Sequence, residues 1–345
     1  MLESIKTFLS ENGTKELMPL KVEIKAFGRI HLGLISLHHS GFRQNGGVGF
    51  MVEGLNISVS GSKSQTIDIL DKRSKPLGAE ELSDLRKTLL DVQRYLRIES
   101  GISIEIDGNI LTHAGAGSGT AIRLASVEAY LILARREYDK RLAQQLSKRG
   151  GTSGVGIHGY FEGGFLLDLG VRARGQSFKP SSSSISPELP LLCKNSVMPN
   201  WEFLVALPQN LSCLTREQEQ IFFSENLPFG ESDTLETAHI ALMGLQAAVM
   251  EKDFEIFCSA LGMLQKSRWK ATERAIHGTV LEELDLSLRN LGADAVAMSS
   301  LGPLLVVFGQ SNVLNAITEQ AKSLKIGVVR SLPQNSGRIV RILES

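Results

Sequence analysis

Four short glycine-rich segments hold the residues of this sequence that are best able to do chemistry. They span residues 46–49, 115–119, 150–159 and 299–303. Glycine suits any turn that needs a positive φ, so one such segment alone indicates only a turn. Four together favour binding of a phosphate-bearing ligand. Segment 115–119 is the sharpest case, because glycines that run into a helix N-terminus leave backbone N–H groups unpaired and able to bind an anion.

Arginine side chains are the expected partners of such an anion. A helix end contributes only about 0.3–1 kcal/mol per charge at an exposed site, which is too little to hold a pyrophosphate group, so cations or Mg²⁺ must assist. A guanidinium grips phosphate as a planar fork. The candidates are Arg29, Arg43 and Arg149, followed by Arg123 and Lys148. Each of them taken alone is more readily explained as a solvated surface residue.

Two common phosphate-binding schemes are missing from the sequence. No lysine-serine pair of the Walker type follows the glycine loop at 115–119. No adjacent acidic pair resembles the ribose-diphosphate clamp of ordinary phosphoribosyltransferases. A different scheme is therefore required.

Histidines, carboxylates and cysteines offer further candidates. His31, His113 and His158 lie beside glycine segments and could act as acid, base or anion donor, with a hydrogen-bonded structural histidine as the alternative for each. We assign no role to three carboxylates at strand ends, because such residues are common: Glu105, Asp107 and Asp168. Three cysteines without metal-ligand spacing are interpreted as packing residues: Cys193, Cys213 and Cys258.

Composition limits the class of partner. The 345 residues are 42% hydrophobic, which is enough for two packed domains. Basic and acidic residues number 37 each, so no overall positive field draws in nucleic acid or an anionic membrane, and a small-molecule partner is expected. The N-terminus lacks the apolar core of a signal peptide and no later run reaches membrane-spanning length, which predicts a cytoplasmic protein. A homodimer is compatible with the sequence.

The elements that must position these residues form a mixed α+β pattern. Alternating segments at 21–35 and 56–62 predict strands, with the glycines of 46–49 between strands. Residues 80–99 carry a helical apolar stripe, and an almost wholly apolar helix follows the loop at 115–119. Residues 149–170 are expected to be turn-rich with one strand.

The domain organisation is predicted from a serine- and proline-rich run at 175–190. We expect an N-terminal appendage at 1–19, a first domain at 20–180 and a second domain at 190–345. The second half should begin with a strand near 201–208, continue with helices across 231–291, and end with strands and a helix at 312–324.

Three motifs resemble those of the GHMP kinases, in the same order and over residues 20–345. AFGRIHLGL resembles the first motif, HAGAGSGTA the phosphate loop and SSLGP the third motif. Phe27 replaces the usual proline, while Gly28 and Arg29 remain. The resemblance implies a ribosomal-protein-like N-terminal domain and a ferredoxin-like C-terminal domain. Those kinases carry a catalytic aspartate after Ser-Gly-hydrophobic, where this chain has Gly156, so ordinary kinase chemistry is not expected.

Further segments resemble the β-ribofuranosylaminobenzene 5′-phosphate synthase family of the methanopterin pathway. They are QNGGVGF, SGVGIHGYFEGGFLLD, SSLGP and LPQNSGRIVRI. This resemblance implies phosphoribosyl pyrophosphate with Mg²⁺ as donor, an aromatic acid as acceptor, and release of CO₂ and pyrophosphate. A related branch makes C-nucleoside antibiotics from a pyrazole dicarboxylate.

The chain departs from that family where the acceptor is expected to lie. Asn45-Gly46-Gly47 stands where Asp-Gly-Gly is expected, Ile35-Ser36 where Ile-Asp is expected, and Gly151-Thr152 in place of a more basic pair. The acceptor therefore stays open between 4-aminobenzoate, 4-hydroxybenzoate and a heteroaromatic amino-carboxylate.

The motifs together predict the site. The catalytic candidates are Arg29, His31 and His158, and no metal ligand is assigned. The predicted substrate-binding residues are Arg43, Asn45, Gly46, Gly47, Gly115, Gly117, Ser118, Gly119, Thr120, Ser153, Gly154, Gly156, Ser299 and Ser300. Two other functions compete: a GHMP small-molecule kinase with an unrecognised base, and a non-catalytic sensor of a phosphate ligand.

Overall fold

The first sheet of the protein is built around one long antiparallel hairpin. The computed structural model describes residues 20–39, 41–181, 183 and 188–344. The hairpin strands are β1 (Leu20–Ser36) and β2 (Arg43–Ser64). Val22, Ile24 and Ala26 alternate into the core along β1, as the period of a half-buried strand requires. The sheet order is β12-β1-β2-β4-β3, with β5 and β6 paired to β2 and β7 paired to β5.

The other strands of this sheet are short. They are β3 (Asp68–Asp71), β4 (Gly101–Gly108), β5 (Phe165–Asp168), β6 (Val171–Arg172), β7 (Leu192–Ser196) and β12 (Ile339–Glu344). Apart from the parallel pair β3 and β4, neighbouring strands run antiparallel.

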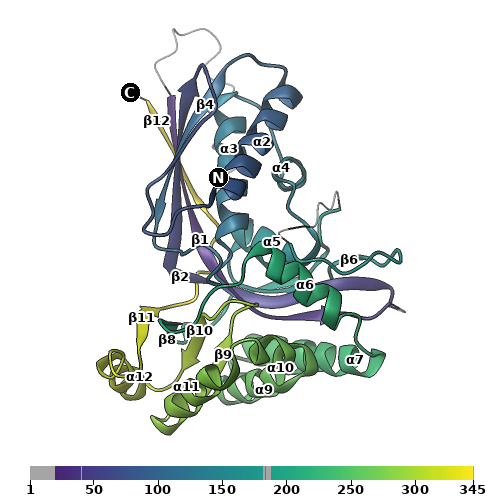
Figure 1. Cartoon of the computed structure of the whole chain (residues 1–345), viewed down its shortest axis with the longest axis vertical. Helices are drawn as coiled ribbons and strands as arrows, with labels where there is room; N and C mark the ends of the chain where they lie inside the picture. The colour runs from purple at the N-terminus through teal and green to yellow at the C-terminus, as the bar shows by residue number, and fades with distance from the viewer. Residues whose placement is uncertain (1–19, 40, 182, 184–187, 345) are drawn as a thin grey trace.

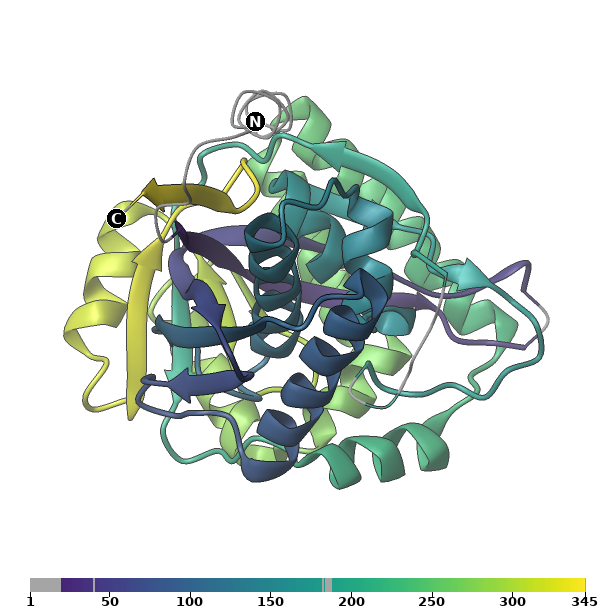
Figure 2. The same ribbon diagram turned by 90° about the horizontal axis from the view of Figure 1, so that it is seen from above.

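Helices cover one face of the first sheet (Figures 1 and 2). The central one is α3 (Ser118–Leu133), which is buried along almost its whole length, as its nearly continuous apolar sequence predicts. It packs against β1 and β2, and against two outer helices, α2 (Ala79–Leu96) and α4 (Lys140–Ser147). Packing of α3 on the sheet fixes the glycine loop that precedes it.

The second sheet is small and four-stranded, in the order β11-β8-β10-β9. Its strands are β8 (Phe203–Pro208), β9 (Ala295–Met298), β10 (Leu305–Phe308) and β11 (Ile326–Ser331). A layer of helices lies below it in Figure 1. These helices are α7 (Glu231–His239), the π-helix η2 (Ile240–Gln246), α8 (Ala247–Glu251), α9 (Phe254–Lys266), α10 (Arg268–Ala275) and α11 (Gly278–Asn290), with α12 (Ser311–Glu319) at the side.

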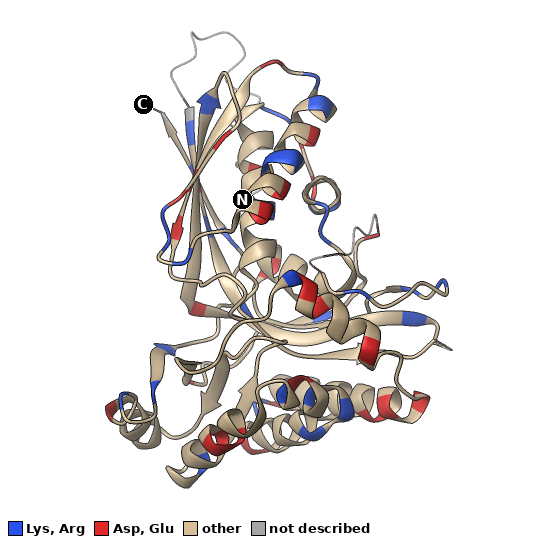
Figure 3. Cartoon of the chain, viewed as in Figure 1, with Lys and Arg blue, Asp and Glu red and all other residues tan. Residues whose placement is uncertain are grey.

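One further helix, α6 (Arg216–Asn226), runs between the two halves of the molecule in Figure 1. Basic and acidic residues are interspersed over the helices in Figure 3, in keeping with their equal numbers. Within the described residues, no helix combines the length and apolar character that crossing a membrane requires.

The chain crosses between the two halves more often than a single boundary near residue 180 predicts. Strand β7 pairs with β5, and β12 pairs with β1 from Leu20↔Glu344 to Lys25↔Ile339. Both strands thus belong to the first sheet although they follow residue 190. Arg338, just before β12, forms a buried ion pair with Glu128 of α3, which ties the C-terminal segment to the first half.

Three local expectations differ from the structure. Residues 151–162 form a 3₁₀ turn, η1 (Gly151–Ser153), and a helix, α5 (Gly154–Glu162), rather than turns, because this segment is almost entirely buried against β1 and β2. Gly46 and Gly47 lie inside β2, not between strands. Helix α12 ends at Glu319, before residue 324. The predicted appendage at 1–19 lies outside the described residues.

Candidate active site

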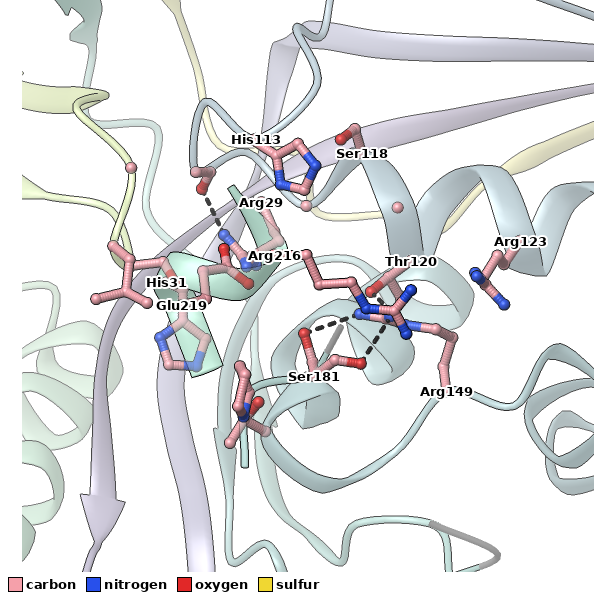
Figure 4. Close-up of a pocket in the computed structure, with 18 of the residues that line it drawn as sticks. Arg29, His31, His113, Ser118, Thr120, Arg123, Arg149, Ser181, Arg216 and Glu219 are labelled. Atoms are coloured by element: carbon pink, nitrogen blue, oxygen red, sulfur yellow. Dashed lines mark hydrogen bonds between the residues drawn. The ribbon is translucent and has the colours of Figure 1, made fainter. Parts of the chain in front are cut away.

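A cavity opens where the loop before α3 meets β1, α2, α6 and the segment Ser299–Pro303 (Figure 4). Its wall carries four arginines and two histidines: Arg29, Arg123, Arg149, Arg216, His31 and His113. Four carboxylates line the same cavity, Glu81, Asp84, Glu219 and Glu273, so arginines and carboxylates are equal in number there.

The loop before α3 is held from both sides. Arg29 on β1 donates its Nη1 hydrogen to the carbonyl of Gly115, and the hydroxyl of Ser299 donates to the same carbonyl at 2.7 Å. A Cβ on Gly115 would stand 2.5 Å from the carbonyl oxygen of Ser299, so only glycine permits this approach. The first and third motifs thus meet on the glycine loop.

The N-terminus of α3 faces the cavity. Gly117 caps the helix with a φ of 81° and supplies no side-chain acceptor, so the backbone N–H groups of Ser118 and Gly119 have no capping partner. Ser118, Gly119 and Thr120 all line the cavity. The N–H of Thr120 donates to the carbonyl of Gly117 at 3.2 Å, so two backbone donors, those of Ser118 and Gly119, stand at the positive end of this buried helix and suit an anion.

Arg149 is the most strongly positioned cation of the site. Its guanidinium donates to Thr120 Oγ1 (3.2 Å), to Ser153 Oγ (2.9 Å) and to both the carbonyl (3.0 Å) and the hydroxyl (2.9 Å) of Ser181. Burial lowers the pKa of Arg149 to about 9, so the side chain remains charged at neutral pH. Burial likewise lowers the pKa of Arg29 to about 10. Both buried arginines donate to carbonyl or hydroxyl oxygens, and Glu219 acts electrostatically on each of them.

Helix α6 brings residues that the motifs do not mark. Arg216, Glu219 and Phe223 recur at three- and four-residue spacing, so one face of α6 points into the cavity. Arg216 spans the opening and bonds Glu80 and Asp84 of α2, each at 2.8 Å. Figure 4 shows Arg216 and Arg149 near Thr120, with Glu219 beside Arg29 and His31. The only sequence signal was the capping box at Thr215 and Gln218, which predicts a helix but no function.

One part of the cavity wall, here called the apolar end, is hydrophobic. Leu34, Phe223 and Leu301 line it and belong to one buried cluster with Trp269. Glu273 of α10 also lines this end, 3% exposed and paired with the fully buried Lys270 at 2.6 Å. His31 lies nearby, and its burial lowers its pKa well below the usual value, which leaves the imidazole neutral at pH 7.

The structure brings many of the predicted residues together. Those that line the cavity are Arg29, His31, Gly115, Gly117, Ser118, Gly119, Thr120 and Ser300. Three more support it from behind: Ser153 bonds Arg149, Ser299 accepts from the backbone N–H of His31 at 3.0 Å, and the α-carbon of Gly156 faces Thr120. Of the further candidates, Arg123 and His113 line the cavity, while Lys148 pairs with Asp91 away from it.

Another group of predicted residues does not line the cavity. Arg43 donates to the carbonyls of Leu169 (2.8 Å) and Gly170 (2.7 Å), beside Asn45 and Gly46, which both have positive φ. A Cβ on Gly47 would lie 2.8 Å from His31 Nε2, and one on Gly154 2.4 Å from the Asp168 carboxylate. These glycines permit close packing.

His158 and the three cysteines do not line the cavity either. His158 Nε2 lies 2.7 Å from the carbonyl oxygen of Pro190, outside the cavity, and burial lowers its pKa to about 4. Of the cysteines, only Cys258 is buried, so packing does not explain Cys193, which is exposed, or Cys213, which is half-buried.

No protein cage for a metal exists in the described part of the chain. No group of three or more histidine, cysteine, aspartate or glutamate side chains is placed there to hold an ion. Glu105 pairs with Lys72 at the surface. Asp168 is 1% exposed and accepts from the N–H of Gly170 at 2.8 Å, and its burial raises its pKa to about 7.

Comparison with known proteins identifies relatives across nearly the full chain. A family model described as "GHMP kinases N terminal domain" matches residues 84–161. An Archaeoglobus fulgidus protein named beta-ribofuranosylphenol 5′-phosphate synthase is 30% identical over 293 residues, which cover 84% of this chain and 88% of that protein. Proteins of the same name from Methanocaldococcus jannaschii and Methanothermobacter thermautotrophicus are 29% and 26% identical, over 88% of this chain and 94% of each relative.

Solved structures show the same fold. Homoserine kinase of Cytophaga hutchinsonii superposes with a TM-score of 0.65 at 17% identity, covering 96% of this chain and all of that one. Mevalonate kinase of L. major, in complex with R-mevalonate, superposes with a TM-score of 0.67 at 15% identity, covering 91% and 96%. The predicted α+β fold of the GHMP kinases is confirmed.

Proposed function

The chain belongs to the family of beta-ribofuranosylphenol 5′-phosphate synthases, and from that premise we propose that it is a decarboxylative C-ribosyltransferase. The proposed donor is phosphoribosyl pyrophosphate with Mg²⁺. The proposed acceptor is an aromatic or heteroaromatic carboxylate that bears a hydroxyl or amino group, of the 4-hydroxybenzoate, 4-aminobenzoate or pyrazole dicarboxylate type. The products are a C-ribosyl aromatic 5′-phosphate, CO₂ and pyrophosphate.

The polar end of the cavity suits the donor. The backbone N–H groups of Ser118 and Gly119 at the start of α3 are available to an anion, and the guanidinium of Arg149 stands beside Thr120. Arg29 lies at the other side of the loop. A pyrophosphate group between these cations would be held in place before it departs, which positions the ribose anomeric carbon toward the apolar end.

Mg²⁺ fits this site as a companion of the substrate. Magnesium usually keeps several waters and binds through substrate phosphates with one or two carboxylates, so a protein cage is not required. Glu219 is the cavity carboxylate that acts electrostatically on both Arg29 and Arg149, and it would meet the ion there. When bound, the ion would neutralise charge on the leaving pyrophosphate.

The proposed reaction requires the enzyme to position donor and acceptor and to exclude water. The bond between the ribose C1 and the pyrophosphate oxygen breaks, and pyrophosphate leaves with the electron pair. The ring carbon that carries the carboxylate bonds to C1, and loss of CO₂ then restores the aromatic ring. Leu34, Phe223 and Leu301 supply an apolar wall against which a ring can lie while water is kept from the cation-like carbon.

The proposal rests on one observation: position 156, which lies behind Thr120, has no side chain. In the kinases with this fold, the matching position holds the catalytic aspartate. Here the α-carbon of Gly156 faces the wall of the anion site with no carboxylate: a Cβ added to it would lie 3.4 Å from Thr120 Cγ2. A phosphoryl transfer to an alcohol lacks its usual base at this place, whereas C-ribosyl transfer needs none there.

A stoichiometric assay tests the proposal. Purified enzyme with phosphoribosyl pyrophosphate, Mg²⁺ and a panel of aromatic and heteroaromatic acids should release pyrophosphate and CO₂ in equal amounts with one class of acid. ATP consumption with an alcohol acceptor would favour the kinase. Tight donor binding with no release for any acid would favour the non-catalytic sensor.

A further inference from the structure

The apolar end of the cavity contains a buried carboxylate, Glu273, held in a fixed place. Its Oε2 accepts from Lys270 Nζ at 2.6 Å. Lys270 is itself fully buried and also donates to the carbonyls of Met298 (2.9 Å) and Ser300 (3.4 Å). The carboxylate is therefore anchored to the Ser299–Pro303 segment, the Trp269 side chain also stabilises its charged form, and Glu273 lines the cavity.

The surroundings of Glu273 are those of a ring-binding site. Trp269, one turn earlier on α10, packs edge-on against Phe223 with ring centroids 5.3 Å apart. Leu34 and Leu301 complete this wall. Burial raises the pKa of Glu273 although Lys270 opposes the shift, so the carboxylate is a stronger base than one in water.

Glu219, another carboxylate of the cavity, has a different proposed role. Both carboxylates act electrostatically on Arg29, Glu219 the more strongly, whereas Arg149 and His113 feel Glu219. Glu273 lies instead beside the apolar residues that would enclose the acceptor.

Resting on the proposed function, we propose that Glu273 binds the ring O–H or N–H group of the acceptor and carries its proton through the reaction. As the proton moves to Glu273, the O or N electron pair enters the ring. The carboxylate-bearing ring carbon then bonds to the ribose C1 while the C1–O bond to pyrophosphate breaks. The bond to CO₂ breaks next, its electron pair restores the aromatic ring, and the ring O or N takes the proton back. Glu273 ends the cycle ionised, as it began.

This role defines the acceptor class. The acid must carry a hydroxyl, amino or ring N–H group conjugated with the attacked carbon, since a proton on that group is what Glu273 accepts. A methyl ether in the same position has no proton to give and would place a methyl group against a buried carboxylate, which leaves the carboxylate without a donor.

The test compares Glu273→Gln with the wild-type enzyme. With the hydroxy or amino acid that the wild type uses best, the variant should lose about 100-fold or more in kcat, the typical contribution of a positioned acid–base group. The rise in melting temperature caused by phosphoribosyl pyrophosphate with Mg²⁺ should stay unchanged, because the donor site is intact. Equal kcat in both proteins, or a parallel loss of the donor-induced stabilisation, would overturn the proposal.

A second measurement uses only the wild-type enzyme. It is needed because Glu273→Gln leaves the Lys270 ammonium buried beside a neutral amide, which lowers the stability of the fold. In the wild type, 4-methoxybenzoate should bind at least about tenfold more weakly than 4-hydroxybenzoate, measured as competitive inhibition of pyrophosphate release. Equal inhibition by the two acids would contradict the role of Glu273. A wild type that releases no pyrophosphate with any acid overturns the proposed function together with this inference, whereas an active wild type with an equally active Glu273→Gln overturns this inference alone.

Discussion

A carboxylate introduced at position 156 should damage donor binding without restoring kinase chemistry. A Cβ at Gly156 would meet the Thr120 side chain at 3.4–3.7 Å, and Thr120 Oγ1 accepts from Arg149 Nε at 3.2 Å. The carboxylate of Gly156→Asp would thus stand against Thr120, the residue that Arg149 bonds and that lines the proposed donor site. Two unit charges at about 4 Å interact by roughly 4 kcal/mol at an effective dielectric of 20. The aspartate both attracts Arg149 away from the donor and repels the donor.

Water and Mg²⁺ screen part of this interaction, so we expect the donor affinity or the rate of pyrophosphate release to fall at least about tenfold, equivalent to 1.4 kcal/mol. Gly156→Asn is the matched control, because its side chain has the same size without the charge. Gly156→Ala adds one carbon atom at ordinary contact distance from Thr120, and the φ of residue 156 lies outside the positive range. This variant should therefore behave like the wild type. Steady-state pyrophosphate release, melting temperature and ATP turnover are measured for all three. Equal behaviour of the aspartate and asparagine variants would refute the electrostatic reasoning, and ATP-dependent phosphorylation by the aspartate variant would revive the kinase.

Three more predictions address stability and ligand choice. Arg338→Met strands the buried Glu128 carboxylate and should lower the free energy of unfolding by about 3–5 kcal/mol, measured in urea; no loss would contradict a structural ion pair. Burial raises the pKa of Asp168 from 3.8 to about 7, so its protonated form stabilises the fold fully below pH 3.8, and this contribution is lost as the pH rises to about 7. Asp168→Asn should therefore gain stability relative to wild type as the pH rises from about 4 to 7, and a constant difference over this range would refute the reasoning. Phosphoribosyl pyrophosphate with Mg²⁺ should raise the melting temperature more than ATP with Mg²⁺ at equal concentration, and the reverse order would favour the kinase.

The loop at 115–119 shows what sequence alone can predict. The apolar run after the glycines predicted the buried helix α3, and the N-terminus of that helix lines the cavity. Arg29 and Arg149 could be selected because they stand beside glycine segments. Their mutual arrangement depends on contacts such as that of Arg149 with Ser181, which no local pattern records.

Other parts of the site could not be predicted, because they depend on tertiary packing. Glycine that permits close packing, as Gly47 does beside His31, looks the same in sequence as glycine that exposes a backbone to a ligand. Helix α6 and Glu273 carry no motif that indicates a function, and they reach the cavity only because the second half of the chain folds over the first. The return of β12 to the first sheet is a long-range pairing that hydrophobic periodicity cannot reveal.

The most direct test of the proposed reaction is the identity of the new bond. The enzyme is incubated with Mg²⁺, phosphoribosyl pyrophosphate labelled with ¹³C at C1, and an acid labelled with ¹³C at the ring carbon that bears the carboxylate. A one-bond coupling between the two labelled carbons in the NMR spectrum of the product, with the carboxylate lost, is the predicted result. A product in which C1 is joined to oxygen or nitrogen, or one that keeps the carboxylate, would contradict decarboxylative C-ribosyl transfer.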